Sequence, residues 1–376
     1  MSIKHPVVPE SKDIGWVKEK LLSLGFSMPE VLSRIGIKKY QNWTHDPDMQ
    51  EKTVNYFLNK SEDELDVLIR LFSLSSTEER RLVEKSFSPS ELNQLAEMDL
   101  LTIDDETVTC DIALSECGGL LIATDSFMKH DPEINAVMPL IGEVYEFNAA
   151  RSKKNVGDTL DLCTGSGVHG LLASRHSEQV ICVDNNPRAI AFSTFNRALN
   201  NISNVEILEG DLFSQLDGKT FDLILANPPY VPSTDIKAGD NHFSGGAKGD
   251  VLSSQIIAGL PKYLKKDGLC QIIHLMICFD GQSMEDWVRS NIGNNANQYS
   301  IVEISCPVVT GNPLTDKATY VKWGVTNIKG NNNGSDSFYC QKDYVYPVEY
   351  DVYHLFETLS LEKNNEERNN ICTTFQ

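Results

Sequence analysis

The feature that most constrains the fold is a repeated alternation of apolar, strand-like runs and helical patterns from Asp158 onward. The strand-like runs are "TLDLCTG", "QVICVDN", "VEILEGD", "FDLILANPP" and "GLCQIIHLMI", and a further helix is expected from about Val251. Strands that alternate with helices predict parallel strands joined by crossover helices. We therefore expect an α/β fold with a Rossmann-like, doubly wound sheet.

The region that follows departs from this alternation. "QYSIVEISC" and "ATYVKWGVT" are two strand-like runs close in sequence, which predicts an antiparallel pair at one edge of the sheet. Beyond Asn327, "KGNNNGSDS" has the composition of a polar linker, and the tail after Leu361 is expected to be disordered.

The first third of the chain has a different pattern. From Asp13 to Arg81 the apolar residues recur at helical spacing, as in "WVKEKLLSLG" and "EDELDVLIRLFSL", which predicts a small helical bundle. Ser88 and Glu91 then have the spacing of a capping box and predict a short helix. Alternating strand-like residues with a turn at Asp104-Asp105 follow, so helix, turn and two-stranded wing predict a winged-helix-like module.

These patterns divide the chain into three parts. We expect an N-terminal helical and winged-helix-like domain over residues 1–130, a catalytic domain over residues 131–327, and a partly disordered C-terminal extension over residues 328–376. The N-terminal domain is expected to have a structural or substrate-covering role, because its helix has no basic stripe.

Charge separates the possible partners. The net charge is −20, and residues 1–150 hold 14 Lys and Arg against 27 Asp and Glu. This balance opposes the counterion release that drives non-specific nucleic-acid binding, and the N-terminal module is the more acidic part. Nucleic acid is therefore disfavoured as a partner, and a small-molecule, peptide or protein acceptor is favoured.

The chain shows the composition of a soluble protein. It has no apolar run of membrane-spanning length and no apolar core of a signal peptide near its start, so no membrane association and a cytoplasmic location are expected. Its nine Cys include no C-x-x-C pair, which argues against a disulfide framework and a metal site. No particular oligomeric state is predicted.

The turn after the first strand of the alternating region carries a ligand signal. "LDLCTGSGVHG" places Gly165, Gly167 and Gly170 in a G-x-G-x-x-G pattern, and Asp184 ends the next strand. Glycines allow a ligand to approach the backbone, and the Asp184 carboxylate can accept hydrogen bonds from ribose hydroxyls. A bound nucleoside is expected, and the glycines alone would also fit a nicotinamide or flavin dinucleotide.

Two further carboxylates narrow the choice of nucleoside. Asp161 lies at the end of the strand, four residues before Gly165, where its charge would repel a pyrophosphate and attract an ammonium group. The cofactor that combines adenosine with an ammonium and a sulfonium is S-adenosyl-L-methionine. Asp211, in "EGDLF", can accept from the adenine amino group, although a strand-end Asp is also a common cap.

The fourth strand ends on Asn227, Pro228, Pro229 and Tyr230. Because prolines cannot continue a sheet, the backbone must leave it here with the Pro228 carbonyl available. The Asn227 oxygen and this carbonyl can hold both N–H groups of a planar nitrogen and direct its lone pair at a methyl group, while Tyr230 stacks on the substrate. The alternative interpretation is a proline-capped strand end whose Asn completes the turn.

Together "DLCTGSGVHG", "VDNNPRAI", "EGDLF" and "LILANPPYVP" resemble the successive motifs of class I S-adenosylmethionine-dependent methyltransferases of the Asn-Pro-Pro-Tyr branch, over about residues 138–326. Within that branch the motifs are similar to those of release-factor glutamine methyltransferases and of adenine and guanine amino methyltransferases. "FSGGAKGD", residues 243–250, is similar to a glycine-rich segment of the glutamine enzymes. The first 130 residues depart from the short helical bundle of those enzymes.

The resemblance implies an enzyme that transfers a methyl group from S-adenosylmethionine to an amide or amine nitrogen of a small molecule, peptide or protein. Asp161, Gly165, Gly167, Asp184, Asp211 and Asn227 are expected to bind the cofactor, and Asn227, Pro228 and Tyr230 are expected to position the acceptor. A nucleic-acid base methyltransferase is the main alternative, and a protein that binds the cofactor without turnover is a third. His169 and His176 are expected to pack rather than catalyse.

Overall fold

The computed structural model describes most of the chain up to residue 330. The described residues are 5–10, 13–36, 52–53, 55–56, 58–126, 135–140, 144–145, 147–148, 151–230, 244–246, 249–279, 284–309 and 318–330. The predicted linker and C-terminal tail lie outside these residues almost entirely, and so does part of the glycine-rich segment 243–250.

A seven-stranded sheet forms the predicted α/β domain. Its strands, in chain order, are β6 (Val156–Leu162), β7 (Ser177–Asp184), β8 (Val205–Glu209), β9 (Phe221–Ala226), β10 (Leu264–Phe279), β11 (Ser300–Val309) and β12 (Ala318–Lys329). Their spatial order is β11-β12-β10-β9-β6-β7-β8, with β6, β9 and β10 in parallel. Because the chain runs outward from β6 in one direction and then from β9 in the other, this is the predicted doubly wound, Rossmann-like sheet.

The last two strands form the expected antiparallel pair, and β12 also pairs with β10. The final strand therefore inserts between β10 and β11, an order that spacing along the sequence does not reveal. The buried side chains of Gln271 and Asn327 face each other across β10 and β12 and share a hydrogen bond of 2.7 Å. This bond satisfies two polar groups that would otherwise be costly to bury.

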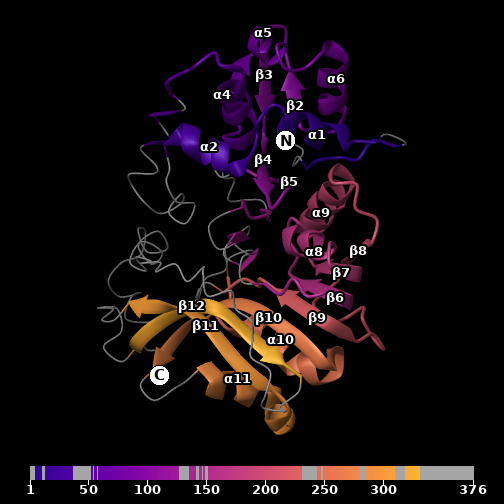
Figure 1. Cartoon of the computed structure of the whole chain (residues 1–376), viewed down its shortest axis with the longest axis vertical. Helices are drawn as coiled ribbons and strands as arrows, with labels where there is room; N and C mark the ends of the chain where they lie inside the picture. The colour runs from indigo at the N-terminus through magenta and orange to yellow at the C-terminus, as the bar shows by residue number, and fades with distance from the viewer. Residues whose placement is uncertain are drawn as a thin grey trace. The chain divides into compact units, whose positions relative to one another are not determined.

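Helices connect the parallel strands. They are α8 (Val168–Ala173), α9 (Pro187–Leu199), α10 (Val251–Tyr263) and α11 (Met284–Ile292), the last followed by the 3₁₀ turn η4 (Gly293–Gln298). The start of α10 at Val251 confirms the prediction for that helix. In Figure 1, α10 and α11 lie together beside the strands β10 and β11 against which they pack.

One charged cluster joins three strands near the amino end of the sheet. Lys265 Nζ lies 2.8 Å from a carboxylate oxygen of Asp158 on β6 and 2.8 Å from one of Asp222 on β9. The two carboxylates raise the pKa of the Lys265 ammonium. Asp222 also accepts the backbone N–H of Asp158 at 2.8 Å, so this cluster fixes the register of β6 against β9.

The N-terminal region begins with helices, as predicted. Its helical elements are α1 (Trp16–Ser23), α2 (Met28–Ile35), α4 (Glu64–Leu68), the π-helical turn η2 (Ile69–Ser73), α5 (Arg80–Val83) and α6 (Pro89–Glu97). Residues 77–79 differ from the helical expectation, because they form the strand β1 (Thr77–Glu79), which pairs with β3. Pairing to a strand distant in sequence outweighs the local helical spacing here.

The capping box predicted at Ser88 is present. The Ser88 hydroxyl accepts the Glu91 N–H at 3.3 Å, and the Glu91 carboxylate accepts the Ser88 N–H at 2.7 Å. After α6 come β2 (Leu101–Ile103) and β3 (Thr107–Cys110), which form a three-stranded antiparallel sheet with β1 in the order β1-β3-β2. A helix and a β-hairpin thus follow each other as expected, and the name winged helix stays a prediction.

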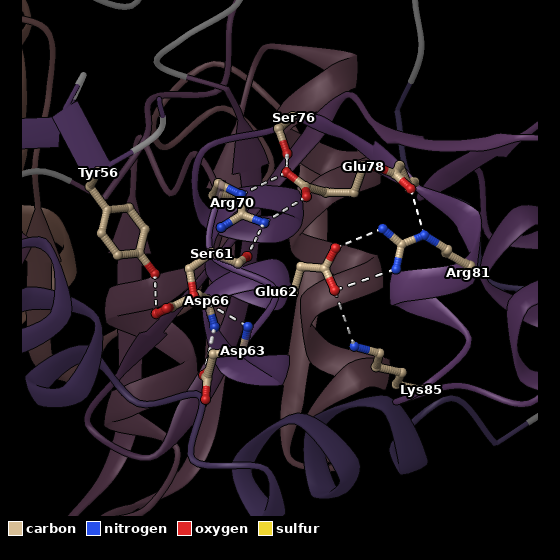
Figure 2. Close-up of polar contacts among 11 residues, drawn as sticks. Tyr56, Ser61, Glu62, Asp63, Asp66, Arg70, Ser76, Glu78, Arg81 and Lys85 are labelled. Carbon is tan, nitrogen blue, oxygen red and sulfur yellow. Dashed lines mark hydrogen bonds and ion pairs between the residues drawn. The ribbon is translucent and has the colours of Figure 1, made fainter. Parts of the chain in front are cut away.

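A buried ion pair ties η2 to this small sheet. Arg70, 2% exposed, donates to both carboxylate oxygens of Glu78 at 2.9 and 2.8 Å and to the Ser61 carbonyl at 2.8 Å. Figure 2 shows this fork and the separate pair in which the Tyr56 hydroxyl donates to Asp66. Removing Glu78 alone would leave the buried Arg70 charge unpaired, at a cost of about 3–5 kcal/mol.

A β-hairpin completes the region. It consists of β4 (Ile112–Cys117) and β5 (Leu120–Asp125), which pair in antiparallel fashion through a turn at Gly118-Gly119. Both glycines have positive φ angles, 57° and 79°, which only glycine adopts without strain. The edge of β5 that faces away from β4 packs on α9.

The chain divides into two compact units that do not follow its linear order. One unit contains residues 1–148 together with 164–175 and 182–209, and the other contains residues 149–163, 176–181 and 210–376. The glycine-rich turn, α8, α9 and β8 therefore belong to the same compact unit as the N-terminal helices. The sequence-based boundaries at residues 130 and 327 stay predictions.

Candidate active site

Backbone hydrogen bonds fix the glycine-rich turn after β6. Thr164 N–H donates to the Val183 carbonyl at 3.1 Å, and Gly167 N–H donates to the Thr164 carbonyl at 2.8 Å. Gly165 N–H donates to the Asp184 carboxylate at 2.8 Å. Each donor and acceptor comes from the turn or from the end of β7, so the loop is closed without a ligand.

The two glycines of the turn have different reasons to lack a side chain. Gly165 has φ 53°, and among the described residues no atom lies within 4 Å of the position where a Cβ would be. Gly167 has φ 82°, and its Cβ would approach the Ser193 Cβ on α9 to 3.0 Å. Gly165 therefore leaves open space beside the backbone, while Gly167 allows the close packing of two segments.

Asp184 ends β7 as predicted, and its carboxylate accepts two backbone N–H groups. One comes from Gly165 at 2.8 Å and the other from Asn186 at 3.0 Å. Burial raises the pKa of the Asp184 carboxyl, and these hydrogen bonds oppose that shift. Hydroxyl groups of a ligand that donate hydrogen bonds to Asp184 would stabilise its ionised form further.

Asp161 and Asn227 belong to neighbouring strands at the switch point of the sheet. Asp161 on β6 is paired with Leu225 on β9, and Asn227 is the first residue after β9. The Asp161 side chain is buried, with 1% exposed. Because the carboxyl ends of parallel strands meet at one edge, the carboxylate and the amide emerge at the same side of the sheet, where doubly wound folds bind ligands.

The Asn-Pro-Pro-Tyr segment follows the last residue of β9 directly. Pro228 is buried and Tyr230 is 9% exposed, whereas Asn227 is half-buried. Within the part of the chain that the structure describes, the Asn227 side chain forms no hydrogen bond. An amide in such a partly shielded position can accept and donate hydrogen bonds to a substrate.

Asp211 differs from the other carboxylates. It is exposed, it lies two residues beyond the end of β8, and its backbone N–H donates to the Ser214 hydroxyl at 3.1 Å. The turn therefore uses its backbone, and its carboxylate faces solvent.

Two further residues, one on α8 and one on α9, belong to the surroundings of the glycine-rich turn. His169 on α8 is 3% exposed and its ring contacts Phe147 edge-on at 4.6 Å, as expected for a packing role. Asn196 on α9, which the sequence interpretation missed, donates to the Ser166 carbonyl within the glycine-rich turn at 2.8 Å. No local pattern marks it, because α9 also carries Arg188, Ser193, Thr194 and Arg197 and the partners of Asn196 lie at least thirty residues away in sequence.

No group of three or more His, Cys, Asp or Glu that could hold a metal ion occurs among the described residues. None of the described helices is both long enough and apolar enough to span a membrane.

Comparison with known proteins finds a family match over about the middle third of the chain. Residues 147–276 match the family described as methyltransferase small domain. A release factor glutamine methyltransferase of Thermodesulfovibrio yellowstonii is 37% identical over 121 residues, which cover 29% of this chain and 43% of that protein. A ribosomal protein uL3 glutamine methyltransferase of Xanthomonas campestris is 32% identical over 174 residues, which cover 41% of this chain and 53% of that protein.

The chain spans about half the length of the curated relatives that it matches. The crystal structure of Methanocaldococcus jannaschii TYW2 with AdoMet aligns over 59% of this chain and 90% of its own, at 14% identity and a TM-score of 0.38. The fold assignment therefore depends on the strand order and not on that alignment. With this order, the glycine-rich turn and the Asn-Pro-Pro-Tyr segment in place, residues 147–276 match the methyltransferase small domain family, and this part of the chain is similar in sequence to glutamine methyltransferases.

Proposed function

We propose that this protein is an S-adenosylmethionine-dependent methyltransferase that modifies the side-chain amide nitrogen of a glutamine in a protein. The observation that carries the proposal is the position of the Asn227 amide at the switch point of the sheet, where it forms no hydrogen bond among the described residues. It directly follows the strand β9, which neighbours the strand that carries the buried carboxylate of Asp161. The relatives support the acceptor, because their names specify glutamine in release factors and in ribosomal protein uL3.

The residues present fit the proposed cofactor. Gly165 leaves open space beside a backbone in the left-handed region, which a Cβ would fill. Asp184 offers acceptor capacity to ribose hydroxyls, and buried Asp161 offers a negative charge to an ammonium group. We assign Asp161, Gly165, Gly167 and Asp184 to cofactor binding. We also propose that Asp211, which is exposed, contacts the adenine amino group.

The bound cofactor would supply an electrophilic methyl group on a sulfonium. The protein then has to make a poor nucleophile react, because the lone pair of an amide nitrogen is delocalised into its carbonyl. The Asn227 side-chain oxygen and the Pro228 carbonyl can each accept one N–H of the acceptor and so turn its lone pair out of conjugation. Tyr230 supplies an aromatic face beside them.

Methyl transfer from a sulfonium requires no general base before the new bond forms. The proton leaves afterwards, from a nitrogen that has become acidic. This agrees with the packing of His169 against Phe147 and with the hydrogen bond between His176 and Arg151 at 2.6 Å, since neither ring is needed as a base. Burial and the neighbouring Arg151 lower the pKa of His176. Orientation of the two reactants and exclusion of water would therefore supply most of the rate.

A protein acceptor suits the charge better than a nucleic acid. The described basic residues of the small sheet region are paired with carboxylates, as in Arg80 with Glu84 and Arg81 with Glu62 and Glu79. The N-terminal domain over residues 1–130 is then proposed to contact the acceptor protein rather than to read bases.

The direct test is transfer of labelled methyl groups from S-adenosylmethionine to release factors, to ribosomal protein uL3 and to tRNA. We expect label in a protein, located by mass spectrometry on a glutamine side chain. Label in tRNA alone would show that the acceptor is a nucleic acid, and it would leave the assignment of the cofactor unchanged. Failure of the purified protein to bind S-adenosylhomocysteine in calorimetry would remove the methyltransferase proposal itself.

A further inference from the structure

Two asparagines, Asn196 of α9 and Asn200 at the C-cap of that helix, pair with the edge of β5 that faces away from β4. Asn196 accepts the Ala123 N–H at 2.7 Å and donates to the Ala123 carbonyl at 2.9 Å. Asn200 accepts the Leu121 N–H at 3.0 Å and donates to the Leu121 carbonyl at 2.7 Å. Each side-chain amide thus pairs with both backbone groups of one residue, as a neighbouring strand would do.

The spacing of the two elements explains why this pairing fits. Four residues of an α-helix rise about 6 Å, and two residues of a strand rise about 6.6 Å. Side chains four apart on α9 therefore face alternate residues of β5. The same face begins with Arg188, four residues before Phe192 and eight before Asn196, and Arg188 forms an ion pair with Asp125 at the end of β5.

Both amides are buried and fully used. Asn196 is 0% exposed and Asn200 is 8% exposed. The second N–H of the Asn200 amide donates to the Asn196 carbonyl at 2.8 Å, a bond within α9. The second N–H of the Asn196 amide instead leaves this seam and donates to the Ser166 carbonyl at 2.8 Å, between Gly165 and Gly167.

The two residues are therefore a natural matched pair. They make the same contact with β5, and only Asn196 reaches the glycine-rich turn. Ser166 itself is 5% exposed, so loss of the Asn196 amide would leave a largely buried carbonyl without this donor.

From this geometry we propose that Asn196 is a positioning residue for cofactor binding. It joins β5 of the N-terminal region to the glycine-rich turn and holds Gly165 and Gly167 in the left-handed conformations that the cofactor requires. The N-terminal region is thereby part of the cofactor-binding structure, and not an appended module. This inference rests on the proposed function for its cofactor, while its structural link can be tested without one.

The test compares Asn196→Ala with Asn200→Ala in the full-length protein. Calorimetry with S-adenosylhomocysteine should show at least tenfold weaker binding for Asn196→Ala and less than threefold for Asn200→Ala, although both variants lower the melting temperature. Hydrogen exchange of the free protein should be at least tenfold faster over residues 164–168 in Asn196→Ala only. Equal effects of the two substitutions on binding and on exchange would refute the positioning role.

A conservative variant separates positioning from general destabilisation. Asn196→Asp keeps the acceptor for Ala123 but places a carboxylate against the Ala123 and Ser166 carbonyls. As the pH falls, the introduced carboxyl becomes protonated and can donate one hydrogen bond. The Kd of Asn196→Asp for S-adenosylhomocysteine, divided by the Kd of the unmodified protein, should therefore decrease toward one. A constant ratio would contradict the proposal. If neither Asn196 variant folds, Asn196→Ser, which retains one donor, replaces them in the same comparison.

The outcomes also separate the two proposals. Absence of S-adenosylhomocysteine binding by the unmodified protein would defeat the proposed function, and the exchange comparison would still decide the role of Asn196. Tight binding by the unmodified protein and by Asn196→Ala alike would defeat only the positioning role.

Discussion

The glycine-rich turn after β6 and the Asn-Pro-Pro-Tyr segment after β9 both follow parallel strands, but they are organised in opposite ways. In the turn, several backbone N–H groups, the Asp184 carboxylate and the Ser166 carbonyl form hydrogen bonds within the protein. In the second, the Asn227 amide has no hydrogen bond among the described residues.

The two arrangements suit two different tasks, cofactor binding and acceptor binding. A cofactor site benefits from a shape that exists before binding, because ordering a loop during binding reduces affinity. An acceptor site for a poor nucleophile needs polar groups that are free to bind the substrate, because groups already satisfied would have to break a bond first. Changes in the turn should therefore affect cofactor affinity, and changes in the segment should affect turnover.

The largest expected effect is on the acceptor side. Asn227→Ala should lower the rate of methyl transfer by about 100- to 1,000-fold, as loss of a preorganised polar contact does in other enzymes. Affinity for S-adenosylhomocysteine should change less than threefold. Asn294→Ala, at an exposed position of η4, is the control. Unchanged turnover in Asn227→Ala would remove this residue from the mechanism. It would also contradict the expectation that changes in the Asn-Pro-Pro-Tyr segment affect turnover.

On the cofactor side, Asp184→Asn should weaken S-adenosylhomocysteine binding by about 10- to 100-fold, because hydrogen bonds to a charged group contribute about 1.5–3 kcal/mol. The new side chain also cannot accept from Gly165 and Asn186 through two equivalent oxygens. Asp217→Asn is the control, since that carboxylate forms an exposed ion pair with Lys262. Calorimetry measures the affinity of both variants for S-adenosylhomocysteine. Equal affinities of the two variants would mean that the ribose does not bind at Asp184.

The pH dependence of binding sharpens this assignment. Burial raises the pKa of Asp184 in the free protein, and a ligand that donates hydroxyl groups needs the carboxylate form. Affinity should therefore be complete above this raised pKa and should fall as the pH decreases through it, by at most about tenfold per pH unit. Binding to Asp184→Asn should lack this dependence, and an identical pH profile for the two proteins would show that another group titrates.

The two glycines provide the smallest and most specific contrast. Gly167→Ala should lower the free energy of unfolding by about 1–3 kcal/mol, because its Cβ would meet Ser193 at a positive φ. Gly165→Ala should lower it by only about 1 kcal/mol, since space is open there, and should weaken cofactor binding instead. Chemical denaturation and calorimetry measure the two quantities; the reverse pattern would mean that the ligand contacts Gly167.

Much of the fold could be predicted from local patterns. The βα alternation, the start of α10 at Val251, the capping box at Ser88 and the antiparallel pair of β11 and β12 all follow from periodicity or from capping chemistry. The strand at Thr77–Glu79 was predicted as helix, because its pairing partner β3 lies about thirty residues away and leaves no local signal. The insertion of β12 beside β10 was likewise invisible in sequence spacing.

The candidate site was recognisable for a related reason. Strand ends, glycine turns and double prolines are local features, so Asp161, Gly165, Asp184 and Asn227 could be named from the sequence. Asn196 could not, because its role depends on a strand more than seventy residues earlier and on a carbonyl thirty residues earlier. The exposure of Asp211 was also decided by how its turn folds.

The sequence by itself determined the order of elements and the chemical groups at the strand ends, since both are encoded within a few residues through periodicity, capping and backbone restriction. Only the tertiary structure decided that the glycine-rich turn is held by Asn196 and that β5 takes its missing partner from a helix. The physical reason is that burial and hydrogen bonding between distant segments depend on which surfaces meet, and that is a property of the folded chain alone.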